Sequence, residues 1–290
     1  MKFRTEISVS SSDFKISHAC KIAMQGSCFA ENIGGKLLNA GFSTDVNPFG
    51  IAYNPMSLSK NLNRLLDNTP FHADELFKDN NAIYHSFSHH SRFSGPDPSE
   101  ALEKINSRMN QSLDFLRTAG LLIVTFGTAF VYRLQSTGEV VSNCHKLPAK
   151  NFSYKRLTMD EITGEWNDLI VRLQAFNPSL RILFTVSPIR HWKDGAHENQ
   201  LSKSVLLLSI DELLRNHASC FYFPAYEIVL DDLRDYRFYA EDMLHPSSQA
   251  IDYVWEKFKA AWFDEETSKQ TLEFEKIHRA LNHVPIIKRD

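Results

Sequence analysis

A cysteine stands where a strand is expected to turn into a helix. Cys28 lies in the segment 26–30, Gly-Ser-Cys-Phe-Ala, which follows the apolar run 21–24 and opens a helical pattern over 30–38. The unpaired N–H groups and the positive dipole end of a helix N-terminus favour the thiolate form of a cysteine. Far downstream, Asp242 and His245 place a carboxylate and an imidazole three positions apart. These residues predict a nucleophile, a base and an orienting acid for acyl transfer.

A structural role for Cys28 is the competing interpretation, because free cysteine is among the most buried residue types. The glycine at position 26 allows a sharp turn just before the helix, and this context favours the catalytic interpretation. Cys20 and Cys220 begin apolar runs and are predicted to be core residues, whereas Cys144 lies in a polar loop. Ser27 is an alternative nucleophile if the turn is offset by one residue.

Asp242 and His245 could also owe their spacing to helix capping. Ser247, however, can cap the helix predicted over 247–263. His245 would then lie in the loop that enters this helix, where Asp242 can bond one nitrogen of the imidazole ring and orient it.

Short apolar runs alternate with helical patterns, which predicts an α/β fold with a parallel sheet covered on both faces. Strands are predicted over 21–24, 121–126, 182–186 and 220–223. Helices are predicted over 30–38, 57–66, 99–119, 158–175, 203–217, 247–263 and 266–281. Thr158 and Glu161 have the spacing of a capping box, and the irregular stretch 69–97 is expected to be an excursion near the site. Such sheets bind ligands beyond the carboxyl ends of their strands, which is where Cys28 falls.

The segments around Cys28 and His245 resemble those of a known family. Residues 26–30 spell the motif of the GSCFA family, which is similar to the SGNH (GDSL-like) esterases and lipases. In that superfamily a Gly-Asp-Ser turn carries the nucleophile and an Asp-x-x-His segment carries the acid and the base. The resemblance, over about residues 15–262, therefore implies these roles for Cys28, Asp242 and His245. It also implies a three-layer α/β/α sandwich of SGNH-hydrolase, flavodoxin-like type.

One position departs from the superfamily pattern. Members usually carry an oxyanion-binding asparagine two positions after the glycine of their third motif block, but Ala129 stands two positions after Gly127 here. The resemblance therefore implies that this donor is missing or is supplied by another residue.

Donors for the negative charge of an acyl-transfer transition state are expected near the strand ends. The main-chain N–H groups of Cys28 and Gly127 are the first candidates, and Gly50 is a further one, because glycine permits close approach of the backbone. Asn54 or Thr128 could replace the side-chain donor.

Arg190 and His191 follow a predicted strand end and are candidates for contact with an anionic group of the substrate, with solvent-exposed charges as the competing interpretation. His85 and His89 could bind zinc if they lay on a helix, but the surrounding composition indicates a loop, so no metal site is predicted. The sequence contains no glycine-rich phosphate loop, and we expect no cofactor.

Length and composition predict one domain over 1–290, with 263–290 as a C-terminal helical extension; 43% of the 290 residues are hydrophobic. A net charge of −3, from 32 basic and 35 acidic residues, indicates neither a nucleic acid nor an anionic membrane as a partner. No apolar run predicts membrane insertion or a signal peptide. Four widely spaced cysteines suit reduced thiols, so a cytoplasmic protein is predicted.

Together these patterns predict an acyl-ester hydrolase or acyltransferase that forms a covalent thioester on Cys28. The expected substrate is a small-molecule acyl or carbohydrate ester. The alternative is the same fold without catalysis, binding a small acyl or carbohydrate ligand, because a fold does not settle a function. Thiol reactivity separates the two, since a triad cysteine is alkylated much faster near neutral pH than the other cysteines.

Overall fold

A parallel sheet of five strands forms the centre of the chain. The structure, a computed structural model, describes residues 4–9 and 14–281. The strands lie in the spatial order β2-β1-β5-β9-β10, and each neighbouring pair is parallel. This is the 2-1-3-4-5 order of flavodoxin-like folds. The strands are β1 (Ile22–Gly26), β2 (Thr44–Val46), β5 (Leu121–Phe126), β9 (Arg181–Val186) and β10 (Cys220–Tyr222).

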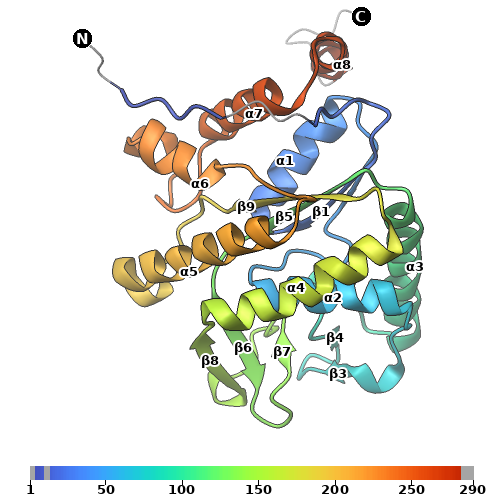
Figure 1. Cartoon of the computed structure of the whole chain (residues 1–290). Coiled ribbons are helices and arrows are strands. Elements are labelled where there is room, and N and C mark those ends of the chain that lie inside the picture. The colour runs from blue at the N-terminus through green and yellow to red at the C-terminus, as the bar shows by residue number, and fades with distance from the viewer. Residues whose placement is uncertain (1–3, 10–13, 282–290) are drawn as a thin grey trace, which may run out of the picture.

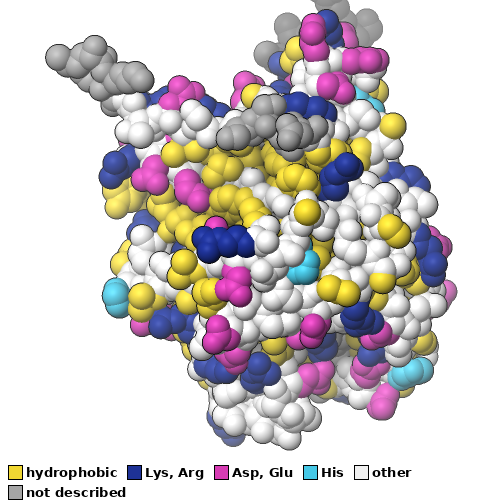
Figure 2. Space-filling view, in the orientation of Figure 1, with side chains coloured by type: hydrophobic (Ala, Val, Ile, Leu, Met, Phe, Trp, Pro, Cys, Tyr) yellow, Lys and Arg dark blue, Asp and Glu magenta, His cyan; other side chains and the backbone are white. Residues whose placement is uncertain are grey.

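Helices cover both faces of this sheet, which confirms the predicted three-layer α/β/α sandwich (Figure 1). On one face lie α1 (Cys28–Asn39), α6 (Ala225–Glu227) and α7 (Ser248–Trp262). On the other face lie α2 (Pro55–Asp67), α3 (Pro98–Arg117), α4 (Met159–Phe176) and α5 (Gly195–Asn216). In the space-filling view, hydrophobic side chains gather over the region between α5 and α7, and charged ones are more frequent below it (Figure 2).

The two cores follow from the alternation of side chains along the strands. In β5, Leu121 and Ile123 face the core under α1 and α7, whereas Leu122, Val124 and Phe126 face the core under α2 to α5. None of these five side chains is more than 3% exposed. A strand that is apolar on both faces is typical of a parallel sheet buried between two helical layers.

The predicted strands and helices are all present, with ends shifted by a few residues. The largest shift is in α5, which begins at Gly195 rather than at 203, because its first two turns are polar and show no apolar period. The sequence pattern also misses β2, an edge strand of three residues. The capping box is confirmed: Glu161 N–H donates to Thr158 Oγ1 at 3.2 Å, and Thr158 N–H donates to the Glu161 carboxylate at 2.9 Å.

Two small antiparallel sheets were not predicted, and both lie on the α2–α4 side of the molecule (Figure 1). One pairs β3 (Leu76–Lys78) with β4 (Tyr84–Ser86), inside the stretch expected to be irregular; the other contains β6 (Phe130–Leu134), β7 (Val140–Val141) and β8 (Phe152–Arg156). Short 3-10 turns are η1 (Ala73–Glu75), η2 (Ser91–Phe93), η3 (Ala149–Asn151), η4 (Trp192–Asp194) and η6 (Tyr236–Phe238), and η5 (Ile228–Asp232) is a π-helical turn.

The predicted C-terminal extension, 263–290, contains α8 (Glu265–Leu281), and its residues 282–290 lie outside the described part of the chain. α8 packs against α7, where the Trp255 indole N–H donates to Glu275 at 2.9 Å. None of the helices in 4–9 and 14–281 is both long and apolar enough to cross a membrane.

Candidate active site

The turn from β1 to α1 places Cys28 at the first residue of the helix, with its side chain partly exposed. The turn requires Gly26, because a Cβ there would lie 2.6 Å from Thr125 Cβ on β5. The N–H of Gly26 donates to Asn47 Oδ1 at 2.8 Å, just after β2. The turn is thus held by both strands that flank β1, and the position of Cys28 is set by the sheet.

Ser27 caps α1 and is fully buried, with 0% of its surface exposed. Its Oγ accepts the Phe29 N–H at 3.3 Å and donates to Ser187 Oγ at 3.2 Å. A nucleophile must be reached by its substrate, whereas this hydroxyl is enclosed and committed to the helix cap. The geometry therefore favours Cys28 over Ser27.

Asp242 and His245 are in direct contact, with Asp242 Oδ2 2.5 Å from His245 Nδ1. The other carboxylate oxygen accepts the N–H groups of Leu244 and His245, both at 2.9 Å, in a turn where Met243 has φ +59°. These two N–H bonds, followed by the imidazole contact, lower the pKa of Asp242 to about 2. The carboxylate is therefore charged at neutral pH, and Nε2 of His245 is the ring nitrogen left to exchange a proton with a nucleophile.

The Asp242–His245 turn is tied to the carboxyl edge of the sheet by main-chain bonds. Arg190 N–H, four residues after β9, donates to Leu244 O at 3.2 Å, and Ala240 N–H donates to His245 O at 2.7 Å. Within the described chain, the hydrogen-bond contact of Cys28 Sγ is with a tyrosine and not with His245. A direct bond between Cys28 and His245 therefore stays a prediction.

Tyr53 is the site residue that the sequence analysis missed. Its hydroxyl lies 3.8 Å from Cys28 Sγ, and its ring meets His191 edge to face with the centroids 5.6 Å apart. Burial, followed by the neighbouring Cys28, raises the pKa of Tyr53, so the phenol keeps its proton. The sequence signal was its place between Gly50 and Asn54, which were both expected near the site.

The expected donors after β5 are committed to the protein's own acceptors. Gly127 and Thr128 donate their N–H groups to Tyr53 O at 2.7 and 3.0 Å, and Thr128 Oγ1 lies 3.1 Å from Ser202 Oγ. Ala129, at the position where the resemblance implied an asparagine, is fully buried. The main-chain hydrogens of Gly127 and Thr128 therefore already serve bonds within the protein, which disfavours them as oxyanion donors.

The Gly50 N–H and one amide hydrogen of Asn54 also serve bonds within the protein. Gly50 N–H donates to Asn47 O at 2.8 Å, which closes a turn. The Asn54 side chain caps α2, accepting the Ser57 N–H at 2.8 Å and donating to Ser57 Oγ at 3.0 Å. Of the expected donors, the Cys28 N–H is the one without an acceptor among the described residues.

Lys203 of α5 ties the ends of β5 and β9 together beneath the site. Its Nζ donates to Gly127 O at 2.6 Å and to Ser187 O at 2.7 Å. The side chain is completely buried, and burial lowers the pKa of Lys203 to about 7. The two carbonyl bonds fix the spacing of the strand ends that carry the site.

The His191 ring packs against the Tyr53 ring and is largely buried, whereas an exposed position was expected for a substrate contact. Its main-chain N–H donates to Asn199 Oδ1 at 2.9 Å. Burial, followed by the charges of Lys203 and His245, lowers the pKa of His191 to about 3, so the ring is neutral at physiological pH. Its Nε2 is buried and without a hydrogen-bond partner in the described chain.

A cavity of about 310 Å³ adjoins the Asp242–His245 turn, and its lining includes Arg190, Trp192, Arg234, Tyr236 and Tyr239. It is next to the turn because Tyr239 forms a bridge with Pro246 and Arg190 bonds Leu244. The Arg190 guanidinium lies 4.0 Å from the centre of the Trp192 ring. Across residues 4–9 and 14–281, neither arginine of this cavity forms an ion pair with a carboxylate.

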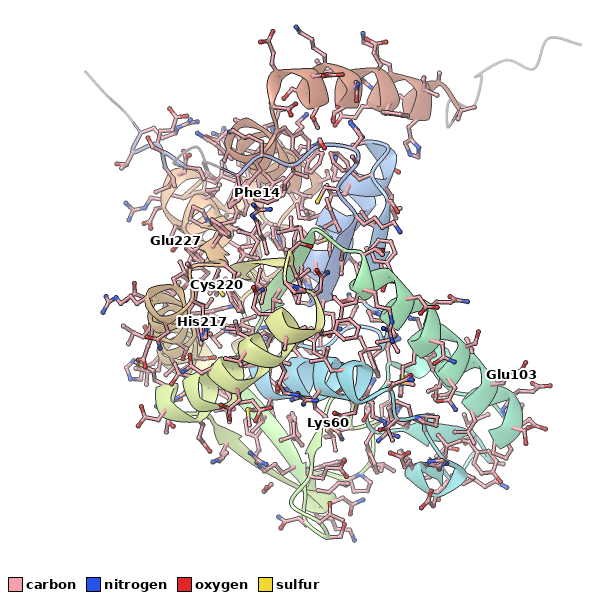
Figure 3. The ribbon with its side chains drawn as sticks, turned by 45° about the vertical axis from the view of Figure 1, so that its right-hand side comes forward. Phe14, Lys60, Glu103, His217, Cys220 and Glu227 are labelled. Atoms are coloured by element: carbon pink, nitrogen blue, oxygen red, sulfur yellow. The ribbon has the colours of Figure 1, made fainter. Side chains whose placement is uncertain are left out.

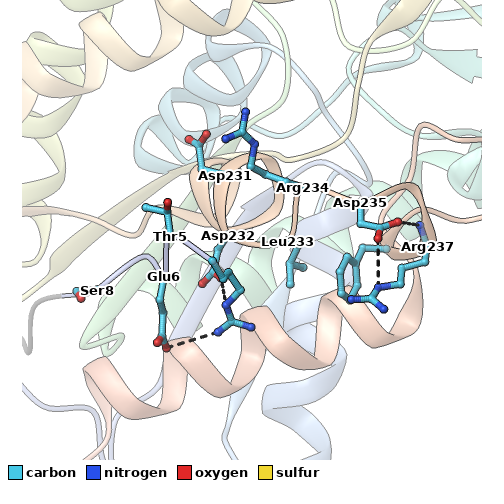
Figure 4. A pocket seen from close by; sticks show the side chains of 11 residues that line it. Thr5, Glu6, Ser8, Asp231, Asp232, Leu233, Arg234, Asp235 and Arg237 are labelled. Atoms are coloured by element: carbon cyan, nitrogen blue, oxygen red, sulfur yellow. Dashed lines mark hydrogen bonds and ion pairs between the residues drawn. The ribbon is translucent and has the colours of Figure 1, made fainter. Parts of the chain in front are cut away.

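A larger cavity, of about 1090 Å³, lies between the N-terminal segment and residues 231–238 (Figure 4). Four of its charged side chains form pairs: Arg4 Nε lies 3.0 Å from Asp232 Oδ1, and Arg237 Nε lies 3.6 Å from Asp235 Oδ2. Tyr253 of α7 also donates to Asp232, at 2.8 Å. We interpret this region as the docking of the N-terminal segment onto α7, and it contains none of the predicted site residues.

The other three cysteines are held as thiols. Burial raises the pKa of Cys20 and Cys144, and it raises the pKa of Cys220 to about 12. Cys220 is the buried core residue that was predicted and lies in β10 (Figure 3), whereas Cys20 is only partly buried at the edge of the core. Among the four, Cys28 is the cysteine at a helix N-terminus.

No group of three or more His, Cys, Asp or Glu side chains that could hold a metal ion is found among the residues described. His85 lies in β4 and its Nδ1 contacts Ser94 Oγ at 2.7 Å, while His89 stacks on Phe49 with ring centroids 5.0 Å apart. Neither histidine lies on a helix, so the two side chains are not placed one helical turn apart as a helical zinc site would require.

Comparisons with known proteins identify one matching sequence family and several solved structures of low similarity. The GSCFA family profile matches residues 21–258. A family 3 carbohydrate esterase from Clostridium thermocellum has a TM-score of 0.40 at 10% identity, over 91% of this chain and 99% of that one. A family 3 carbohydrate esterase from Talaromyces cellulolyticus has a TM-score of 0.38 at 8% identity, over 88% of this chain and 99% of that one. A family two carbohydrate esterase from C. thermocellum, in complex with cellohexaose, has a TM-score of 0.42 at 11% identity, over 92% of this chain and 67% of that one. No curated protein matches the sequence.

Proposed function

This chain belongs to the GSCFA family, and from that premise we propose that it hydrolyses or transfers the acyl group of a small ester through a thioester on Cys28. The observation that carries the proposal is the Asp242–His245 pair, at 2.5 Å, on the same edge of the sheet as a partly exposed thiol at a helix N-terminus. A carboxylate-oriented imidazole beside a thiol is the arrangement that activates cysteine as a nucleophile.

In the first half-reaction, Cys28 Sγ bonds to the ester carbonyl carbon while His245 Nε2 takes the thiol proton. The electron pair of the C=O bond moves onto oxygen. The oxyanion then reforms the carbonyl, the bond to the alcohol oxygen breaks, and His245 returns the proton to that oxygen. Asp242 stabilises the imidazolium through Nδ1 between these steps.

In the second half-reaction His245 takes a proton from water or from another acceptor, which attacks the thioester. The carbon–sulfur bond breaks and the Cys28 thiol is restored. Water gives hydrolysis, and an alcohol or amine gives acyl transfer; the same residues perform both.

We place the alcohol portion of the ester in the cavity of about 310 Å³ beside Leu244. Exposed rings of Trp192 and Tyr236, with polar side chains nearby, are typical of pockets that orient a small polar ligand. The guanidinium groups of Arg190 and Arg234 favour a carbohydrate or other alcohol that carries a negative charge.

The test is mass spectrometry of the intact protein after incubation with a panel of activated acyl esters. We expect one acyl adduct that maps to Cys28, none on Cys28→Ala, and an adduct on Ser27→Ala, the matched neighbour. An adduct on Cys28→Ala that vanishes in Ser27→Ala would identify Ser27 as the nucleophile. Iodoacetamide is the control for access: a thiol that is alkylated but never acylated would favour the non-catalytic, ligand-binding alternative.

A further inference from the structure

In the site described above, most of the expected oxyanion donors already serve bonds within the protein. Gly127 and Thr128 are bonded to Tyr53 O, Asn54 caps α2, and Ala129 has no polar side-chain atom. The free N–H of Cys28 supplies one donor. Acyl transfer gains most from two or more donors aimed at the charge that develops on oxygen, so a further group is needed.

Tyr53 brings a hydroxyl to the required place. Its Oη contacts Cys28 Sγ at 3.8 Å, and the residue is 37% exposed, so that an ester can reach it. The oxyanion is attached to the carbon that bonds to Sγ, and a hydroxyl that already touches the sulfur is within reach of that oxygen.

The fold holds this hydroxyl in position without help from a substrate. The carbonyl of Tyr53 accepts the N–H groups of Gly127 and Thr128 at 2.7 and 3.0 Å, which fixes the backbone against the end of β5. The ring lies edge to face on the buried His191 at 5.6 Å. A donor that is fixed before the reaction stabilises charge without reorganising, which is the source of oxyanion-hole catalysis.

We propose that Tyr53 is a catalytic residue whose hydroxyl donates a hydrogen bond to the oxyanion formed when Cys28 attacks an ester, in place of the asparagine that Ala129 replaces. The inference rests on the proposed function. During attack the thiol proton goes to His245 Nε2, the carbonyl electron pair goes to oxygen, and the Tyr53 O–H bond stays intact. Burial raises the pKa of Tyr53, so the proton needed for donation is present throughout the neutral range.

The test compares two reactions of the same sulfur in Tyr53→Phe, which keeps the ring on His191 and removes only the hydroxyl. With 4-nitrophenyl acetate we expect the rate of Cys28 acylation to fall by about 10²- to 10³-fold, as for loss of one oxyanion donor. Iodoacetamide alkylates the sulfur at a saturated carbon and forms no oxyanion, so its rate should stay at the wild-type value. Tyr84→Phe, on β4, is the matched control and should change neither rate.

Each outcome bears on the proposal. Wild-type acylation in Tyr53→Phe would overturn it and leave the proposed function intact. An equal fall in both rates would also overturn it, because Tyr53 would then act on the sulfur or on the fold. If the wild-type protein is alkylated but accepts no acyl group from any ester, the proposed function fails first and takes this role of Tyr53 with it.

Discussion

The two parts of the candidate site are built in different ways. The β1–α1 turn is held by long-range contacts: Gly26 lies against Thr125 and bonds Asn47, and Ser27 is buried against Ser187. The Asp242–His245 turn is built from its own four residues, and both side chains are 47% exposed. The sheet therefore fixes where the nucleophile lies, whereas the local chain fixes how the base is oriented.

This difference predicts different consequences for substitutions. A larger residue at Gly26 in the β1–α1 turn disturbs the packing of the sheet, so it should lower the free energy of unfolding together with activity. A change in the exposed acid–base turn should lower activity alone, since surface substitutions usually leave stability nearly unchanged.

The largest effect is expected at the nucleophile. Cys28→Ser keeps the position but replaces a thiol with a hydroxyl, which is far weaker as an acid and must be deprotonated during attack. We expect acyl labelling and turnover to fall to a low residual level in Cys28→Ser and to be absent in Cys28→Ala, with unchanged thermal unfolding in both. A fully active Cys28→Ser would show that the site does not depend on thiolate chemistry.

The next effect separates orientation from proton transfer. Asp242→Asn keeps the shape of the turn but no longer stabilises an imidazolium, so we expect turnover to fall by less than the ~10⁴-fold seen in serine triads, because a thiol needs less help. His245→Ala removes the base, so its turnover should fall further. Turnover of one activated ester and the melting temperature are measured together, and wild-type turnover in Asp242→Asn would remove its assigned role.

Gly26→Ala tests the part held by the sheet. The added Cβ would lie 2.6 Å from Thr125 Cβ and 2.7 Å from Thr125 O, so the strands must move apart. Overpacking of this kind costs about 1–3 kcal/mol, which urea unfolding would detect. Gly35→Ala is the matched control, because a Cβ at Gly35 meets no atom within 4 Å. Equal unfolding midpoints for the two variants would contradict the account of the turn.

The smallest effect concerns Lys203 and pH. Its pKa is lowered from 10.5 to about 7 in the folded protein. Between these pH values the unfolded chain binds a proton that the folded chain does not, so the contribution of Lys203 to stability increases with pH above 7 and is lost as pH falls toward 7. In Lys203→Met, the free energy of unfolding should rise less between pH 7 and pH 10 than in the wild type. Parallel profiles would show that the lysine is protonated in both states.

Sequence periodicity predicted the fold well, because most strands and helices have a recognisable pattern within their own residues. Leu121–Phe126 is a continuous apolar run, and the helix after Thr158 carries its own cap. The pattern failed where structure depends on distant partners. β2 has three residues and exists through its pairing with β1, and the first turns of α5 are polar.

The site divides in the same way. Cys28, Asp242 and His245 could be proposed from sequence because each belongs to a short local motif. His245 meets Asp242 as their spacing indicated, whereas the catalytic roles of the three residues stay predictions. Tyr53 could not be found, since its role depends on a contact with Cys28, 25 residues away. Sequence shows that an N–H or amide is present but not which acceptor it has already taken, as the bonds from Gly127 to Tyr53 O and from Asn54 to Ser57 illustrate.

The local construction of the acid–base turn has a consequence for motion. Asp242 and His245 lie three residues apart in one turn, and the bonds that orient the imidazole lie within that turn. If the segment moves outward to admit a bulky ester, the bond from Arg190 N–H to Leu244 O must break, whereas the base travels with its acid. The rate of catalysis would then depend on the fraction of molecules in which the segment lies close enough for His245 to reach Cys28.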